Sequence, residues 1–358
     1  MIIVKDPKII VDNKTVEYKF DCIYPDKKTN IFIKLDQFYK TFISDTSDAA
    51  LVAMLLPAMV DNHELVIEGK ISKKLYNNLN DLQDLIIKVI PWVHKIKVNI
   101  QNIVDTNFKN KEIVFTGFSA GVDAFTTLQD YFLQPKTDIK VTHLLFNNLI
   151  YNDTIAQDKY NFLKPLADKL ELPFIQTYTN FHELYAKKKI GFEQTHPIRN
   201  AVIAHLLSGK GSTFLYSSSF PLRDFEIKPW SDIAIVNKLL LPLLSSNNVD
   251  ILDVGSEYTR VQKTNIIANN EYSYDYLDIC IGKKHLKSDY YNCSQCYKCM
   301  RALMTFEKLG VIEKYSKLFD LDIYYKNKNN YLKKVKRSTQ LNDVDLVRFL
   351  NGEINVNT

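Results

Sequence analysis

Hydrophobic residues follow two periodicities in the first third of the chain. Short extended runs at 16–20, 30–35, 64–68 and 96–100 alternate with stretches at 48–59 and 72–89, where apolar residues recur at i, i+3, i+4 and i+7. The second spacing places apolar side chains on one face of a helix. We therefore predict a smaller N-terminal α/β domain over residues 1–108.

The pattern changes after residue 108. Between residues 109 and 275, five segments are continuous apolar runs: 113–115, 141–146, 174–177, 213–217 and 249–252. Such runs are typical of strands that are buried on both faces, as in a parallel sheet covered by helices. We predict a parallel five-stranded sheet with helices on both faces. A cysteine-rich segment (276–310) and a basic, helical tail (311–358) follow it.

Four of the five cysteines lie close together in the sequence, namely Cys280, Cys293, Cys296 and Cys299. Four thiolates with a C-x2-C-x2-C core can complete a tetrahedral Zn²⁺ shell, and an iron–sulfur cluster is the alternative. The first residues lack the apolar core of a signal peptide, so we expect a reducing, cytoplasmic location, where disulfides are disfavoured. The sequence therefore predicts a structural metal site.

The first strand of the central region leads directly into a loop of small residues, Gly117–Ala124, here called the serine loop. Between a strand and a helix, such a loop presents backbone N–H groups that bind phosphate. Ser119, Gly121 and Asp123 match the S-G-G-x-D-S pattern of a pyrophosphate loop, whereas Ala120 and Ala124 depart from it. We expect Ser119, Ala120, Gly121, Val122, Asp123 and Ala124 to contact a nucleotide.

Two other interpretations of the serine loop stay open. Gly117, Ser119 and Gly121 also match the G-x-S-x-G nucleophile elbow of α/β-hydrolases. A hydrolase needs a histidine later in the chain, and His285 is the only late candidate. The third interpretation is an ordinary tight loop in an α/β protein.

Several residues after other strands complete the candidate site. Glu257, Arg260 and Thr264 are predicted on one face of a helix after the strand 249–252, with Lys263 beside them. Helix starts at the carboxyl ends of strands surround ligands in open α/β sheets. Weaker candidates, each at a strand end or a helix start, are Ser217 for the nucleotide, His196 for ATP or substrate, and Asp232 for Mg²⁺.

Composition adds two further points. The 358 residues are 46% apolar, and the longest apolar stretch, 49–60, is shorter than the ~20 residues of a membrane-spanning helix. The net charge of +5 depends on six basic residues between 326 and 337, with tyrosines among them. We interpret this segment as a solvated helix face, with a nucleic-acid-binding tail as the alternative.

The serine loop and the cysteine cluster, about 160 residues apart, together resemble the 7-cyano-7-deazaguanine synthase-like branch of the PP-loop ATP pyrophosphatase (adenine nucleotide alpha hydrolase) superfamily. The similarity covers roughly residues 110–305. It implies a HUP-type fold that binds ATP and Mg²⁺ through the serine loop, Ser217, Arg260 and Lys263, together with zinc held by the four cysteines.

The resemblance also implies a reaction. ATP would be split into AMP and pyrophosphate, with Ser119, Asp123 and Lys263 as catalytic residues, to activate a carboxylate or amide for attack by ammonia or another nucleophile. The expected substrate is a small-molecule or peptide carboxylate, and a homodimer is the expected assembly. A degenerate, non-catalytic nucleotide-binding protein and the serine hydrolase are the alternatives.

Overall fold

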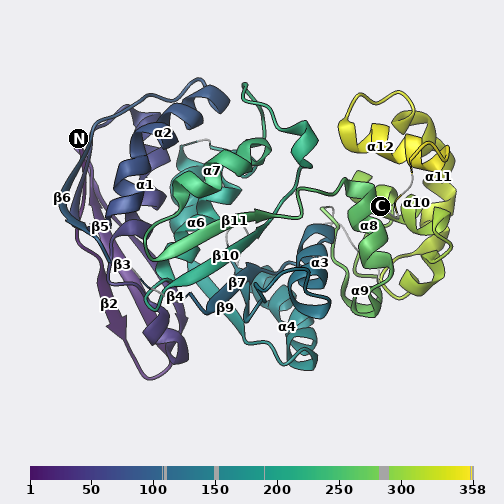
Figure 1. Ribbon diagram of the computed structural model, residues 1–358, viewed down its shortest axis with the longest axis horizontal. Coiled ribbons are helices and arrows are strands. Elements are labelled where there is room, and N and C mark those ends of the chain that lie inside the picture. Colours follow the sequence, from purple (N-terminus) through teal and green to yellow (C-terminus); the bar gives the residue numbers. More distant parts are fainter. Residues whose placement is uncertain are drawn as a thin grey trace. The chain divides into compact units, whose positions relative to one another are not determined.

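The chain is organised as two compact units. The computed structural model describes residues 1–106, 108, 111–148, 153–188, 190–281, 290–354 and 356. Unit 1 comprises Met1–Gly117, Val141–Ser218 and Asp224–Val254, and unit 2 comprises Phe118–Lys140, Ser219–Arg223 and Gly255–Thr358 (Figure 1). Residue 109, where the second domain is predicted to begin, lies outside the described residues, and the four-domain division stays a prediction.

Unit 1 contains an eleven-stranded mixed sheet, with the strand order β11-β10-β7-β8-β9-β4-β3-β1-β5-β6, and β2 paired with β3. The strands are β1 (Ile2–Val4), β2 (Lys8–Val11), β3 (Thr15–Ile23), β4 (Lys28–Asp36), β5 (Leu65–Ser72), β6 (Val98–Val104), β7 (Ile113–Gly117), β8 (His143–Asn147), β9 (Phe174–Thr179), β10 (Ser212–Ser217) and β11 (Val249–Val254).

The five predicted central strands are present as β7 to β11, and they pair in parallel. The prediction that they form a complete sheet was wrong, because β9 also pairs with β4 in antiparallel orientation. Only Ile33 with Thr179 and Lys34 with Tyr178 are in register there. Periodicity reports which face of a strand is buried but not which strand lies at its edge, so this junction leaves no signal in the sequence.

Helices flank the sheet of unit 1. They are α1 (Asp48–Asp61), α2 (Lys73–Val89), α4 (Asp153–Lys169), α5 (Phe181–Lys187), α6 (His196–Leu206) and α7 (Asn237–Leu244), with the 3-10 turns η1 (Gln37–Phe42) and η4 (Ile233–Val236). The helices predicted at 48–59 and 72–89 are confirmed as α1 and α2. Helix α1 packs against α6, and α2 packs against α7.

Helices dominate unit 2. They are α3 (Val122–Leu128), which continues as the π-helical turn η2 (Gln129–Leu133), α8 (Arg260–Ala268), α9 (Glu271–Tyr276), α10 (Tyr297–Lys308), η6 (Ile312–Tyr315), α11 (Leu321–Val335) and α12 (Leu341–Leu350). The short 3-10 turn η3 (Leu222–Asp224) begins in this unit. Helix α8 packs against α3, α10 and α12.

Part of the basic tail is used for packing within unit 2. Tyr324 is fully buried, and its hydroxyl donates to Glu307 Oε2 over 2.6 Å. Lys328 Nζ pairs with Glu307 Oε1 at 2.6 Å, and the Tyr331 hydroxyl donates to the Tyr297 carbonyl oxygen. The tyrosines at 324 and 331 therefore anchor α11 to α10, which favours the interpretation of this segment as a packed helix over a nucleic-acid-binding tail.

Candidate functional site: the serine loop, its cations and the cysteine cluster

The serine loop leaves the sheet at the end of β7. Ser119 is exposed, whereas Ala120 is fully buried and has a φ of +56°. This left-handed backbone costs an L-residue about 1 kcal/mol or more, and it is the conformation that glycine adopts without penalty. Ala120 therefore takes the backbone conformation expected of the glycine that stands at this position of the pyrophosphate-loop pattern.

Asp123, in the first turn of α3, accepts hydrogen bonds from two cations of α8. Arg260 Nη1 lies 2.9 Å from Asp123 Oδ2, and Lys263 Nζ lies 3.0 Å from Asp123 Oδ1. Burial raises the pKa of Asp123, but attraction to Arg260 and Lys263 outweighs burial and holds the pKa of this carboxyl below its usual value. The three side chains, here called the Asp123 cluster, carry a net charge of +1.

The start of α8 places both cations. Thr259 is the N-cap of this helix, and its hydroxyl accepts from the Gln262 N–H while the Gln262 side chain accepts from the Thr259 N–H. Such a reciprocal capping box fixes where a helix begins. Arg260 and Lys263 then fall three residues apart on neighbouring positions of the helix surface. The prediction that Glu257 shares this helix was wrong, because α8 begins at Arg260.

The Lys263 side chain is buried. It is only 2% exposed, although an ammonium is rarely buried without a partner. Gly255, with a φ of +77°, lies beside it, and a Cβ added to this glycine would lie 3.7 Å from Lys263 Cε. The main chain after β11 therefore passes close to the lysine at a residue whose backbone conformation favours glycine.

Unit 2 also joins the serine loop to the segment that precedes the cysteines. The Asp278 N–H donates to the Ala120 carbonyl oxygen over 2.8 Å. Asp278 is two residues before Cys280. A main-chain hydrogen bond within unit 2 therefore connects the serine loop to the start of the cysteine cluster, although the two motifs are far apart in the sequence.

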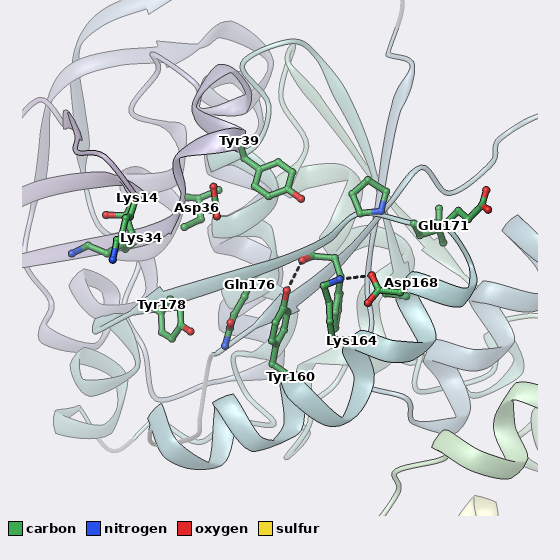
Figure 2. A pocket seen from close by; sticks show the side chains of 16 residues that line it. Lys14, Lys34, Asp36, Tyr39, Tyr160, Lys164, Asp168, Glu171, Gln176 and Tyr178 are labelled. Atoms are coloured by element: carbon green, nitrogen blue, oxygen red, sulfur yellow. Dashed lines mark hydrogen bonds and ion pairs between the residues drawn. The ribbon is translucent and has the colours of Figure 1, made fainter.

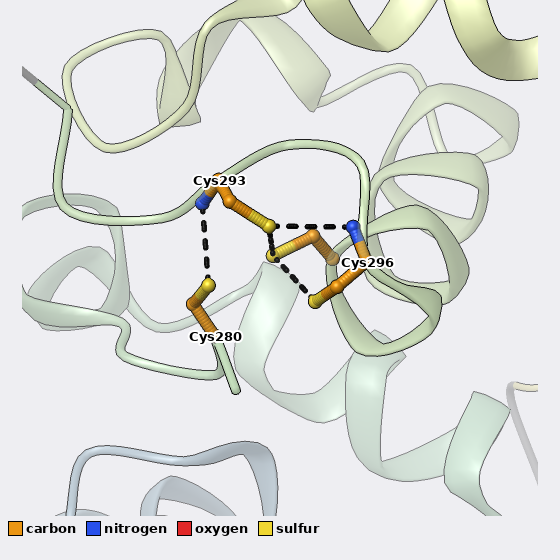
Figure 3. Close-up of side chains that lie close together, drawn as sticks. Cys280, Cys293 and Cys296 are labelled. Atoms are coloured by element: carbon orange, nitrogen blue, oxygen red, sulfur yellow. Dashed lines mark hydrogen bonds between the residues drawn. The ribbon is translucent and has the colours of Figure 1, made fainter. Parts of the chain in front are cut away.

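The four cysteines predicted as metal ligands come together (Figure 3). Their Sγ atoms all lie within 4.8 Å of one another. Cys293 Sγ lies 3.9 Å from Cys299 Sγ, and Cys296 Sγ lies 3.4 Å from Cys299 Sγ. Four sulfurs at about 2.3 Å from one tetrahedral zinc would be separated by about 3.8 Å, so the spacing fits a metal such as zinc.

Backbone geometry supports the cysteine cluster. The Cys293 N–H donates to Cys280 Sγ, and the Cys296 N–H donates to Cys293 Sγ over 3.3 Å. Ser294, between them in the sequence, has a φ of +57°. N–H groups aimed at sulfur stabilise the thiolate form that binds metals.

Asn292 holds Cys280 in this cluster. Its buried side chain accepts from the N–H groups of Ile279 and Cys280 at 3.0 and 3.1 Å and donates to the Leu277 carbonyl oxygen at 2.9 Å. Sequence reasoning missed Asn292. Its position directly before the C-x2-C-x2-C run was the only available signal, and asparagine is common in loops without such a role.

The four thiols influence one another's ionisation. A hydrogen bond from the Cys299 thiol lowers the pKa of Cys293 to about 6, and a hydrogen bond from Cys280 lowers the pKa of Cys296 well below its usual value. The hydrogen bond with Cys296 raises the pKa of Cys280 to about 11, and contact with Cys280 also raises the pKa of Cys299. A bound metal ion would balance the charge of four thiolates.

The weaker candidates lie in unit 1. Ser217 is the last residue of β10, and His196 is the first residue of α6. Asp232 caps η4, accepting from the Ala234 N–H over 2.9 Å, and Nε2 of His196 lies 3.0 Å from Asp232 Oδ1. Asp232 is therefore engaged by a histidine and a backbone N–H, and its proposed role in holding Mg²⁺ has no support from these contacts.

The nucleophile-elbow interpretation gains no support from the loop geometry. An elbow strains the backbone to expose its serine, whereas here Ala120 is the residue with positive φ and Ser119 is not. His285, the only histidine in the sequence of unit 2, lies outside the described residues.

Unit 1 also contains a pocket of about 700 Å³ beside the pairing of β4 and β9 (Figure 2). Tyr39 of η1 and Tyr160 of α4 are among its lining residues. The Tyr160 hydroxyl donates to the Phe174 carbonyl oxygen over 3.1 Å, and burial raises the pKa of Tyr160 to about 12. None of the site residues predicted from the sequence lines this pocket.

Comparisons of the chain with protein-family models, curated proteins and solved structures found no match. In the parts of the chain that the structure describes, no helix has the length and apolar character needed to span a membrane. The resemblance to PP-loop enzymes therefore depends on the motifs and on the contacts between their residues.

Proposed function

We propose that this protein is an ATP-dependent adenylating enzyme of the PP-loop type, which splits ATP into AMP and pyrophosphate to activate a carboxylate or amide oxygen. The observation that carries the proposal is the Asp123 cluster. Arg260 and the buried Lys263 converge on Asp123, which lies near the end of the serine loop and in the first turn of α3. Both cations contact Asp123, and together they would attract the phosphates of ATP.

The chemistry requires positioning and charge neutralisation more than a side-chain nucleophile. As the bond between the α and β phosphates breaks, negative charge develops on the departing pyrophosphate. Arg260 and Lys263 are the cations that would stabilise this charge, and N–H groups of the serine loop would hold the phosphate oxygens. Mg²⁺, bound with ATP, would neutralise further phosphate charge.

The cysteine cluster has a structural role in this proposal. Zinc bound by Cys280, Cys293, Cys296 and Cys299 would fix the segment whose Asp278 N–H donates to the Ala120 carbonyl oxygen. Four thiolates fill a tetrahedral zinc shell and leave no open position for substrate, which is the usual distinction between structural and catalytic zinc.

The test is ATP–pyrophosphate exchange across a panel of carboxylates and amides. We expect exchange with the wild-type protein and a loss of at least ~100-fold in the Lys263→Met variant, because a transition-state cation is removed. Lys317→Met is the matched control, because Lys317 is also in unit 2 and also pairs with an aspartate, Asp275, but is 77% exposed.

Other outcomes would replace the proposal. ATP binding without AMP or pyrophosphate formation for any substrate would identify a degenerate nucleotide-binding protein. Hydrolysis of p-nitrophenyl esters that is abolished by Ser119→Ala would instead establish a serine hydrolase.

A further inference from the structure

Strand β2 is an outer strand of unit 1 with an open, apolar edge (Figure 1). In the described part of the sheet it pairs only with β3, so its other edge has no neighbouring strand. All four of its residues are exposed, and Ile9, Ile10 and Val11 retain between 45% and 49% of their accessible surface. Three consecutive exposed apolar residues on an open edge are rare without a function, because such an edge can pair with another strand.

The β2–β3 hairpin shows which backbone groups of β2 point to the open edge. The Asp12 N–H donates to the Thr15 carbonyl oxygen over 3.0 Å, so these two residues form a hydrogen-bonded pair. Hydrogen-bonded and non-hydrogen-bonded pairs alternate along antiparallel strands. In the register of β2 with β3, Ile9 and Val11 therefore direct their N–H and C=O groups away from β3. A partner strand must form its hydrogen bonds with these two residues.

In a two-fold pairing, outward-pointing residues must lie opposite one another, and one register achieves this for both Ile9 and Val11. When antiparallel copies pair about Ile10, each Ile9 lies opposite the partner's Val11, and such a pair exchanges both of its N–H···O bonds. A pairing centred on Ile9 would place Val11 opposite Pro7, which has no N–H to donate. A pairing centred on Val11 would place Ile9 opposite Asn13, in the hairpin turn. The backbone therefore selects the register centred on Ile10.

The charges at the two ends of β2 fit the same register, which places Lys8 opposite the partner's Asp12. Within the chain, Lys8 lies opposite Lys19 of β3, and like charges in such a pair are unfavourable. Neither lysine forms an ion pair with any residue that the structure describes. Hydrogen bonds from the Lys14 and Thr15 N–H groups lower the pKa of the exposed Asp12 carboxyl and keep it ionised. A second copy would therefore supply the anion that Lys8 lacks.

The side chains divide between the two faces of the combined sheet. Ile9 and Val11 lie opposite buried residues of β3, so pairing of two copies would extend an apolar face. On the opposite face, each Ile10 would meet its own copy between the two charge pairs. Branched side chains of this kind pack well against cross-strand neighbours.

We propose that β2 pairs with the β2 of a second copy of this chain, antiparallel and centred on Ile10, so that the two sheets become continuous. Strand β2 lies outside residues 110–305, over which the sequence resembles PP-loop enzymes, so this interface follows from the N-terminal strands alone. It is independent of the proposed ATP chemistry. Residues 8–12 of each chain are far fewer than the ~20–30 residues a side of a standard interface, so the dimer should be weak and reversible.

Sedimentation velocity of the whole chain tests the dimer. We expect a monomer at about 1 µM and increasing dimer toward about 300 µM, as for a dissociation constant on the order of 100 µM. Lys8→Glu places a carboxylate opposite the partner's Asp12, and Asp12→Lys places an ammonium opposite the partner's Lys8. Each variant alone should therefore self-associate about tenfold more weakly, or less.

An equimolar mixture of Lys8→Glu and Asp12→Lys chains should dimerise about as well as wild type. In the mixed dimer, the two introduced charges lie opposite one another, and so do the two natural residues, so both pairs are attractive. Lys97→Glu is the control, because Lys97 is 75% exposed and lies directly before β6, another outer strand. It should dimerise like wild type. Hydrogen exchange of β3 peptides checks that Asp12→Lys leaves the hairpin formed.

Disulfide cross-linking tests the register. The Cα atoms of a non-hydrogen-bonded antiparallel pair lie about 4.5 Å apart, within the range that a disulfide spans. Ile10→Cys should therefore form an intermolecular disulfide under mild oxidation. Ile9→Cys should form much less, because its two copies are offset along the strands by more than a disulfide can bridge. Wild type, which retains all five cysteines, gives the background.

Several results would overturn the proposal. They are a monomer at about 300 µM, a Lys8→Glu variant that dimerises like wild type, or a cross-link that is stronger at position 9 than at position 10. A mixture of folded Lys8→Glu and Asp12→Lys chains that stays monomeric would do the same. If Asp12→Lys opens the hairpin, Lys8→Glu and the two cross-links still decide.

Discussion

The Asp123 cluster gives the sharpest stability prediction. Asp123→Asn preserves the size of the side chain but removes the charge that compensates Lys263, whose ammonium is 2% exposed. Breaking a buried pair by removing one partner costs about 3–5 kcal/mol. Asp123 and Arg260 are each about a quarter exposed, so water screens part of the interaction. We therefore expect Asp123→Asn to lower the free energy of unfolding by about 3 kcal/mol, at the lower end of that range.

A double-mutant cycle isolates the pair. Lys263→Met removes the buried cation while retaining an unbranched apolar stem, so Asp123→Asn should be much less costly in that background. The expected coupling energy is about 1.5 kcal/mol or more. Additivity to within about 0.5 kcal/mol would refute the claim that Asp123 compensates a buried lysine.

The assay must report on unit 2. Both tryptophans, Trp92 and Trp230, belong to unit 1, so their fluorescence follows the other unit. Hydrogen exchange of α8 peptides in increasing urea gives the free energy of opening of the region that holds Arg260 and Lys263.

The same pair predicts a pH dependence. The pKa of Asp123 is lowered in the folded state, so its stabilisation is complete above the unfolded pKa of about 3.9 and is lost as pH falls through the folded pKa. The stability difference between wild type and Asp123→Asn should therefore be constant above about pH 4 and shrink below it. A constant difference down to the acid transition would show that the carboxylate is not selectively stabilised.

Three further predictions concern the loop and the metal. Ala120→Gly should leave the opening free energy of α3, measured by hydrogen exchange, unchanged or raise it by up to about 1 kcal/mol. Ala124→Gly, within that helix, should lower it by about 1 kcal/mol. Equal effects of the two substitutions would contradict the strained backbone at Ala120. Elemental analysis should find about one zinc per chain, lost in Cys296→Ser but retained in Cys22→Ser; iron would indicate a cluster instead. Gly255→Ala should cost about 1–2 kcal/mol because its φ is positive, and an unchanged urea midpoint would contradict this.

The sequence was most informative where the signal is local. Continuous apolar runs located the five parallel strands, and cysteine spacing located the four thiols. The start of α8 has a local signal too, since Thr259 and Gln262 have the spacing of a capping box, and this signal excludes Glu257 from the helix. Local patterns report the conformation and burial of a segment because neighbouring side chains determine both.

Contacts between distant segments were not readable in this way. Nothing in the periodicity of β4 indicates that Lys34 pairs with Tyr178, which extends the central sheet into the N-terminal strands. The same limit applies to Tyr216, a β10 residue whose hydroxyl meets His196 only after the strand and α6 have packed. Such partners are set by three-dimensional packing, and no fixed sequence spacing encodes them.

The Asp123 cluster suggests how the proposed site would discriminate among anions. Asp123 neutralises part of the charge of Arg260 and Lys263, so an anion must compete with a carboxylate that lies 2.9 and 3.0 Å from the two cations. A monoanion that displaces Asp123 replaces one negative charge by another, so it gains little electrostatic energy. A triphosphate brings several charged oxygens at once and can share both cations while the serine loop amides hold others. Asp123 would thus weaken the binding of singly charged anions more than that of polyphosphates. Specificity depends on such a difference in affinities.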